Sequence, residues 1–101
     1  MDKDSITIAV DEEIIDLIPR YLENRWGDVH AMEAALAAAD FDTIRRLGHS
    51  MKGSGGGYGL DSVTDMGHGL EEAAKGQDLD LARRWVEKLR DFLERVRVVP
   101  G

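Results

Sequence analysis

Apolar residues recur at helical spacing through most of this 101-residue chain, and that spacing restricts the fold more than any other feature. At about 100° of rotation per residue, such residues line one side of a helix, in a stripe about a third of its circumference wide. The pattern predicts helices over residues 11–36, 40–58, 61–76 and 78–96. Because the connections between them are short, we expect an all-α fold, an antiparallel up-and-down four-helix bundle.

Acidic residues typical of N-caps mark the expected helix starts. They are Asp11 for the first helix, Asp40 or Asp42 for the second, Asp61 for the third, and Asp78 or Asp80 for the fourth. Pro19 lies within the first helix, where it either kinks the helix or becomes the first residue of a second one. We therefore expect a first helix that is kinked or split.

The two ends of the chain have strand-like patterns. Residues 5–10 alternate and are rich in β-branched side chains, and residues 96–99 are similar. The expected result is a short two-stranded ribbon formed by the termini. Such a ribbon needs to pack on the helices, because an isolated one is marginally stable.

Composition limits what the chain does. At 101 residues without a biased linker, it is expected to be a single domain over residues 1–101, and a monomer. It has no cysteine, which excludes disulfides and thiolate chemistry. A net charge of -7 argues against nucleic-acid binding. The sequence contains neither a signal-peptide pattern nor a long apolar run, so we expect a cytoplasmic protein without membrane association.

His49 is the residue with the clearest functional signal. It falls roughly 170° from the centre of the apolar stripe of the second helix, so it is expected to face solvent. The cations Arg45, Arg46 and Lys52, together with Gly53 and Gly56, lie on the same outward face. These cations would disfavour an imidazolium and attract the oxygens of a phosphoryl group. His30 lacks such neighbours, and His68 has acidic ones.

The cationic face favours a phosphate-carrying histidine over an ordinary surface histidine. A neutral imidazole is a nitrogen nucleophile, and a lysine three residues on, Lys52, can reach the phosphate that it acquires. Gly53 removes the side chain that would stand beside the imidazole, so another protein can close over it. We interpret Arg45 and Arg46 as part of an ordinary charged helix face, which at most tunes docking.

Residues 53–59 contain a dense cluster of glycines. Glycine in a helix interior costs about 1 kcal/mol relative to alanine, so the cluster needs an explanation. One explanation is a helix that stops near Gly53, or close packing against a neighbouring helix. The other is a smooth docking surface. The spacing does not decide between them.

Residues 49–54, which read His-Ser-Met-Lys-Gly-Ser, resemble the His-x-x-Lys-Gly-Ser signature of histidine-containing phosphotransfer domains. Gly59-Leu60 and residues 70–74, Leu-Glu-Glu-Ala-Ala, extend the resemblance, as does the helical pattern from about residue 11 to residue 96. The triple glycine at 55–57 is richer than the usual pattern.

The resemblance implies a phosphorelay protein in which His49 exchanges a phosphoryl group with aspartates of receiver domains. The partner is then a receiver domain of a response regulator or of a hybrid histidine kinase. Lys52 is implied as the phosphate-stabilising cation, Gly53 as the clearance position, and Ser54 and Gly59 as supporting residues. The domain binds no cofactor of its own, and the magnesium needed for transfer comes from the receiver.

Other functions fit the sequence less well. No second nucleophile, paired base or nucleotide cradle accompanies His49, so the chain is expected to be a phosphocarrier without turnover of its own. Asp65, His68 and Glu72 could ligate a metal, but a solvated face is favoured, and no metal site is expected. The competing interpretation is an interaction module that binds a receiver without carrying phosphate. Acid-labile, base-stable phosphate on the chain would separate the two.

Overall fold

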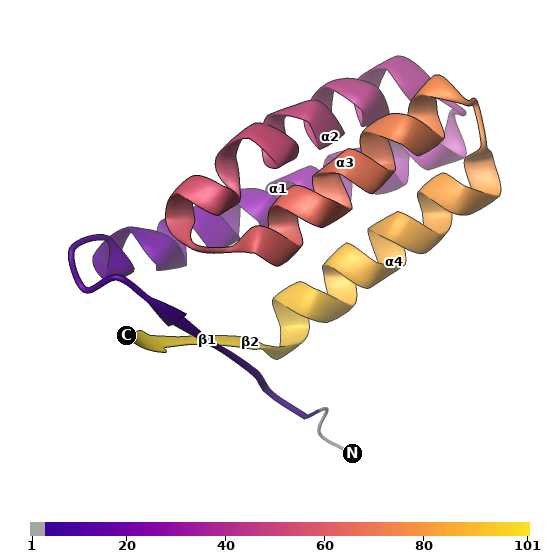
Figure 1. The fold of residues 1–101 in the computed structure, drawn as a ribbon. Helices are drawn as coiled ribbons and strands as arrows, with labels where there is room; N and C mark the ends of the chain where they lie inside the picture. The colour runs from indigo at the N-terminus through magenta and orange to yellow at the C-terminus, as the bar shows by residue number, and fades with distance from the viewer. Residues whose placement is uncertain (1–3) are drawn as a thin grey trace.

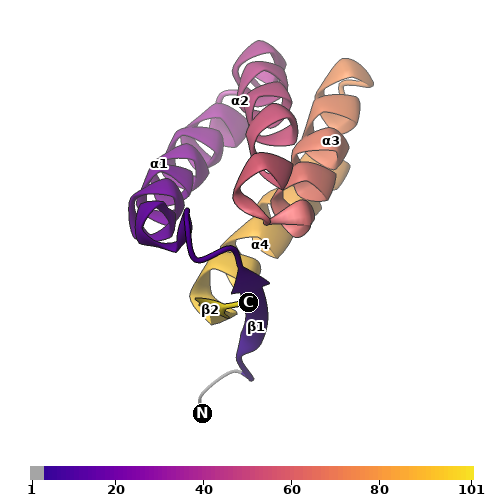
Figure 2. The same ribbon diagram turned by 60° about the vertical axis from the view of Figure 1, so that its left-hand side comes forward.

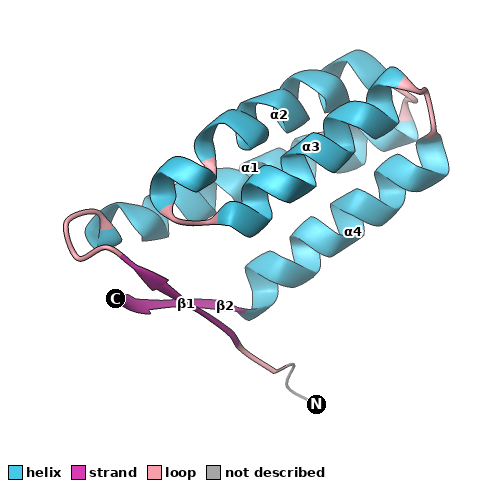
Figure 3. Ribbon diagram, in the orientation of Figure 1, coloured by secondary structure: helices cyan, strands magenta, loops and turns pink. Residues whose placement is uncertain are grey.

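A computed structural model describes residues 4–101, and the helical periodicity of the sequence becomes four α-helices within that range. They are α1 (Ile18–Ala37), α2 (Phe41–Ser54), α3 (Asp61–Lys75) and α4 (Leu79–Arg95). Strands β1 (Ile6–Val10) and β2 (Val96–Pro100) flank them, and short 3-10 turns lie at η1 (Ile15–Leu17) and η2 (Gly56–Tyr58) (Figure 3). The four-helix architecture predicted from the sequence is therefore confirmed.

Successive helices run in opposite directions and pack side by side as an up-and-down bundle (Figures 1 and 2). Each helix contacts its two neighbours in the ring, and α2 and α3 share the most extensive interface. The apolar stripes meet in the middle, where several side chains are fully buried: Ile18, Val29, Met32, Ile44, Met51, Leu70 and Leu89. In the described part of the chain, no helix is long and apolar enough to cross a membrane.

The first helical segment is split rather than continuous. Its leading residues form the separate turn η1, and α1 begins one residue before Pro19. Proline suits the first turn of a helix because it lacks the N–H that would go unpaired there. The sequence suggested that Asp11 caps the first helix, but the N-cap of α1 is Leu17. The Asp11 carboxylate accepts a hydrogen bond from the Glu13 N–H at 2.9 Å, within the turn that precedes η1.

The helix starts at α2 and α4 follow the predicted acidic caps. The carboxylate of Asp40 accepts a hydrogen bond from the N–H of Thr43 at 3.2 Å, and that of Asp78 accepts one from the N–H of Leu81 at 3.0 Å. Each bond satisfies a donor in the first turn that has no partner inside its helix.

The start of α3 differs from the prediction. Its N-cap is Leu60, which makes no side-chain cap, and Asp61 is the first helical residue instead of the cap. The chain enters α3 through Gly59, whose φ of +75° lies in the left-handed region that glycine adopts at low cost. This turn places the fully buried Leu60 at the cap position, so Asp61 is the first residue inside the helix.

The two terminal strands pair, as predicted, and they pair in parallel. The register runs from Ile6 opposite Val96 to Val10 opposite Pro100. Both strands cross the same end of the bundle, as Figure 1 shows. Their inward residues, including Ile8 and Val98, pack against the helical core, which supplies the support that an isolated ribbon lacks.

Glycines allow the backbones of α2 and α3 to approach each other closely. A Cβ atom placed on Gly48 would lie 2.8 Å from both the Glu71 nitrogen and the Gly67 oxygen. A Cβ atom on Gly67 would lie 2.7 Å from the Gly48 oxygen. No real side chain fits in these spaces, so the two helices touch through their main chains. The approach brings Glu71 of α3 against the outward face of α2.

Candidate functional site

His49 lies on the outward face of α2, as the helical spacing predicts. Its side chain is 67% exposed, while Ile44, Gly48 and Met51 are buried on the opposite side of the helix. The imidazole is therefore open to an incoming molecule without any rearrangement of the bundle.

The imidazole of His49 is held by a carboxylate of the neighbouring helix. Its Nδ1 atom lies 2.7 Å from Oε2 of Glu71. An ionised carboxylate only accepts hydrogen bonds, so Nδ1 carries the proton and donates it, which leaves the lone pair on Nε2. Within residues 4–101, Nε2 makes no hydrogen bond of its own. The site presents a nitrogen nucleophile to solvent, with its tautomer fixed from behind.

Lys52 binds the other oxygen of the same carboxylate. Its Nζ atom lies 2.6 Å from Oε1 of Glu71, whose side chain is only 5% exposed. The hydrogen bond from Lys52 is the main reason that the pKa of Glu71 falls from 4.5 to about 2. Desolvation opposes that shift, and the hydrogen bond with His49 and the charge of Lys75 add to it. Glu71 is therefore an anion at neutral pH, and it links His49 to Lys52.

Glu71 is the functional residue that the sequence reasoning missed. It lies within residues 70–74, and the sequence pattern marks it only as one of the acidic residues near His68. A signal was present, because Gly67 lies one turn before Glu71 and Ala74 one turn after, at the edge of the apolar stripe of α3. A carboxylate at the edge of a buried stripe needs a partner, which directs attention to the facing helix.

The expected all-cationic surroundings of His49 are wrong in two respects. The group that touches the imidazole is the Glu71 anion, and the two arginines are turned toward Asp42. Arg45 lies 3.0 Å and Arg46 lies 3.2 Å from the carboxylate oxygens of Asp42. Pairs at these helical spacings are neighbours on one face, and they hold the guanidinium groups a turn away from the imidazole.

The glycines after Lys52 serve different purposes. Helix α2 continues through Gly53 and ends at Ser54, and a Cβ atom on Gly53 would meet nothing within 4 Å. Gly55 instead packs tightly, since its Cβ would lie 2.6 Å from the backbone nitrogen of Thr64. The Gly56 N–H donates to Oγ1 of Thr64 at 2.8 Å. Close packing therefore explains Gly55, whereas the open space at Gly53 leaves its docking role a prediction.

Ser54 and Gly59 support the fold around the site. The hydroxyl of Ser54 lies 2.8 Å from that of Tyr21 on α1, and the Tyr21 ring stacks on Tyr58 with centroids 4.2 Å apart. Gly59 makes the left-handed turn into α3 described above. Neither residue contacts the imidazole of His49 in the described structure.

The acidic cluster on α3 is composed differently from the predicted one. Ligand atoms of His68, Glu71 and Glu72 lie within 4.8 Å of one another, and Asp65 is not part of this group. One oxygen of Glu71 is hydrogen-bonded to His49 and the other to Lys52. Of the three residues in this cluster, Glu71 is the one hydrogen-bonded to His49.

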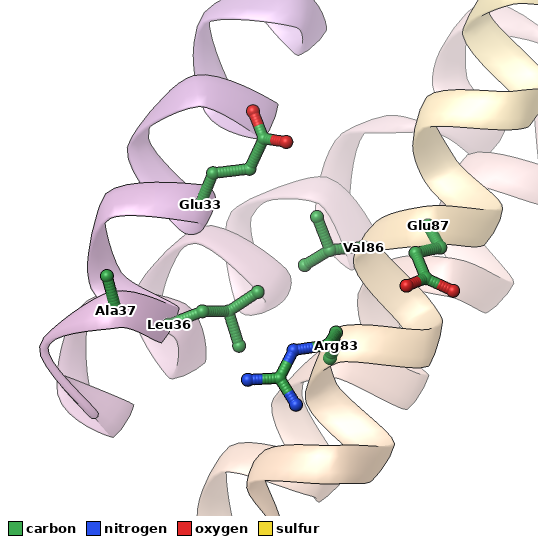
Figure 4. A pocket seen from close by; sticks show the side chains of 6 residues that line it. All are labelled: Glu33, Leu36, Ala37, Arg83, Val86 and Glu87. Carbon is green, nitrogen blue, oxygen red and sulfur yellow. The ribbon is translucent and has the colours of Figure 1, made fainter.

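A hollow of about 360 Å³ lies elsewhere, between α1 and α4 (Figure 4). Apolar and charged side chains both line it: Glu33, Leu36, Ala37, Arg83, Val86 and Glu87. None of these residues belongs to α2 or α3, which carry His49 and Glu71. His49 and Glu71 therefore do not line this hollow.

The family model of the Hpt domain matches residues 10–98 of the chain. A search of curated proteins and a search of solved structures found no significant match. Because the family match spans most of the sequence, the chain belongs to the Hpt domain family. It is a phosphotransfer module of two-component signalling. The partners of this family in phosphorelays are receiver domains.

Proposed function

We propose that His49 accepts a phosphoryl group from the aspartyl phosphate of a receiver domain and passes it to another receiver. The observation that carries this proposal is the 2.7 Å contact between Nδ1 of His49 and Oε2 of Glu71. It leaves Nε2 unprotonated and exposed, which is the state that an attacking nitrogen requires.

In the proposed step, the Nε2 lone pair attacks the phosphorus atom of the aspartyl phosphate. The N–P bond forms, the P–O bond to the aspartate breaks, and the receiver carboxylate leaves with the electron pair. The Nδ1 proton stays in place, so the phosphorylated ring is positively charged. The Glu71 carboxylate stabilises that charge, in the way that the acidic member of a catalytic triad stabilises an imidazolium. Transfer to a second receiver is the reverse reaction.

Lys52 and the magnesium ion of the receiver are proposed to neutralise the transferred group. The Lys52 side chain is 35% exposed and lies one turn after His49, on a flexible stem that can follow a phosphoryl oxygen. Phosphoryl transfer depends chiefly on positioning and charge neutralisation, so a lysine here and a metal ion on the partner divide that task.

The docking surface is proposed to centre on Gly53. Open space at this position lets the receiver approach the imidazole over the flat end of α2. Gly56 and the paired residues Arg45 and Arg46 would lie toward the edges of the contact. We further propose that the chain acts as one domain over residues 1–101, as a monomeric cytoplasmic carrier without turnover of its own.

The test is to incubate the purified chain with a receiver domain phosphorylated on aspartate, in magnesium, and to follow intact mass. We expect the wild type to gain one phosphate that is labile to acid and stable to base. His49→Ala should gain none. His30→Ala and His68→Ala, which change exposed histidines on α1 and α3, are the matched controls and should load normally.

Two outcomes would oppose the proposal. Uptake by His49→Ala at the wild-type rate would exclude His49 as the acceptor. No uptake by the wild type from several receivers, together with measurable binding to one of them, would favour a module that binds receivers without carrying phosphate.

A further inference from the structure

Lys75 is a third charged group near the carboxylate of Glu71. It is the last residue of α3, and its Nζ atom lies 3.9 Å from Oε2 of Glu71. This is the oxygen that accepts the hydrogen bond from Nδ1 of His49. The Lys75 ammonium and the imidazole therefore share one oxygen of Glu71, and Lys75 comes from α3 whereas Lys52 comes from α2.

Lys75 is bound only loosely by its partners, Glu71 and Glu72. Its distances of 3.9 Å to Glu71 and 3.7 Å to Glu72 are those of loose ion pairs, longer than a charge-assisted hydrogen bond. Its side chain is 52% exposed, on a stem with enough rotatable bonds to move the ammonium by several ångströms. Ion pairs of this exposed kind hold a lysine only weakly.

Charge counting at the site shows what such a cation would do. Lys52 faces the negative charge of Glu71 at 2.6 Å, so Lys52 alone does not balance both this carboxylate and an added phosphoryl group. A phosphoryl group on Nε2 adds about two negative charges, and the positive charge of the phosphorylated ring offsets one of them. Arg45 and Arg46 are held by Asp42. The remaining negative charge needs a cation close to the ring, and Lys75 is placed to supply it.

We propose that Lys75 is a second phosphate-binding cation, which turns from Glu71 and Glu72 to a phosphoryl oxygen when His49 is phosphorylated. The proposal rests on His49 being the phosphoacceptor. Lys52 and Lys75 then hold the phosphoryl group from the two helices that Glu71 joins. Lys75 stabilises the phosphorylated form of this chain relative to the phosphorylated receiver.

The experiment measures the equilibrium of phosphate between a receiver and the chain, for the wild type and three variants. Lys75→Ala should shift the equilibrium toward the receiver by roughly 3- to 10-fold. Lys75→Arg, which keeps the charge, should stay within about twofold of the wild type. Lys88→Ala is the matched control, because Lys88 is an exposed lysine on α4, 5.0 Å from the Trp85 ring.

A second measurement separates phosphate contact from a structural role. Phosphorus NMR follows the second ionisation of the phosphoryl group as pH changes. Loss of a neighbouring cation raises the pKa of that ionisation, so the titration of Lys75→Ala should move to higher pH than that of the wild type. A change in helix stability alone would leave this titration where it is.

The outcomes distinguish the inference from the function on which it rests. A wild type that takes up no phosphate on His49 overturns both. A wild type that loads normally, with Lys75→Ala showing the same equilibrium and the same phosphorus titration, overturns only the role of Lys75.

Discussion

Nδ1 of His49 and Oε2 of Glu71 lie 2.7 Å apart although 22 positions separate the two residues in the sequence. The contact joins α2 to α3 and fixes which ring nitrogen holds the proton. Lys52 binds the second oxygen of the same carboxylate, so one buried side chain orients both the nucleophile and its neighbouring cation. The tautomer of the exposed histidine thus depends on a buried residue of the neighbouring helix.

Replacing Glu71 with glutamine should slow phosphoryl uptake while preserving the shape of the site. The amide no longer stabilises the positive ring that forms on phosphorylation, and partners of this kind are worth about 10- to 100-fold in activity. Single-turnover transfer from a phosphorylated receiver measures the rate. Glu87→Gln, which removes an exposed charge on α4, is the control. Uptake by Glu71→Gln within about twofold of that control would exclude a positioning role.

The stability contribution of Glu71 should depend on pH. Its pKa is 4.5 without the folded environment and about 2 in the folded chain, because the hydrogen bond from Lys52 favours the anion. The stabilisation is therefore fully present above the unfolded value and disappears as pH falls from 4.5 toward 2. Urea unfolding of the wild type and of Glu71→Gln at a series of pH values measures it. The difference in unfolding free energy should shrink as pH falls through this window, and a constant difference would contradict the assignment.

A leucine at Gly53 should impair transfer more than folding. A Cβ atom there meets nothing within 4 Å, and replacing a helical glycine removes a helix penalty of up to about 1 kcal/mol. The thermal midpoint should therefore hold or rise, while the larger side chain obstructs the receiver. Gly53→Ala serves as the size control. Wild-type transfer rates in Gly53→Leu would mean that clearance is not what this glycine provides.

Alanine at Gly48 should destabilise the bundle. Its Cβ would lie 2.8 Å from backbone atoms of α3, and overpacking of this kind typically costs about 1–3 kcal/mol. Urea unfolding measures the loss. Gly27→Ala is the matched control in α1, where a Cβ meets nothing within 4 Å. Equal stability of the two variants would show that α2 and α3 can separate without cost.

Ser54→Ala should lower stability by about 1 kcal/mol and leave phosphoryl uptake unchanged. Ser54 shares a 2.8 Å hydrogen bond with the buried Tyr21, away from the imidazole. The double variant with Tyr21→Phe should be about as stable as either single variant, since one bond is removed in each case. Fully additive losses in chemical denaturation would argue against this bond.

The sequence predicted the features that depend on local spacing. Helical periodicity placed His49 on the outward face, and it anticipated the break near Pro19 and the pairing of the two termini. Local spacing could also have predicted the ion pairs of Asp42 with Arg45 and Arg46. Asp42 lies three and four residues before Arg45 and Arg46, which is the geometry of pairing on one helix face.

Other features depend on how the helices meet, and the sequence did not predict them. The burial of Glu71 follows from the main-chain contact at Gly48 and Gly67, which no single-helix pattern reveals. The parallel direction of β1 and β2 follows from the path of the chain across one end of the bundle. The position of Asp61 changed because the turn at Gly59 delivers Leu60 to the cap.

The approach of Gly48 to Gly67 also has a consequence for how sequences of this kind can diverge. Exposed positions on α2, including the charged ones, can change with little effect on the fold. Positions 48 and 67 cannot gain a side chain without separating the carboxylate from the imidazole. We expect distant relatives that keep the histidine site in this form to retain this pair of glycines, even where little else in the two helices is shared.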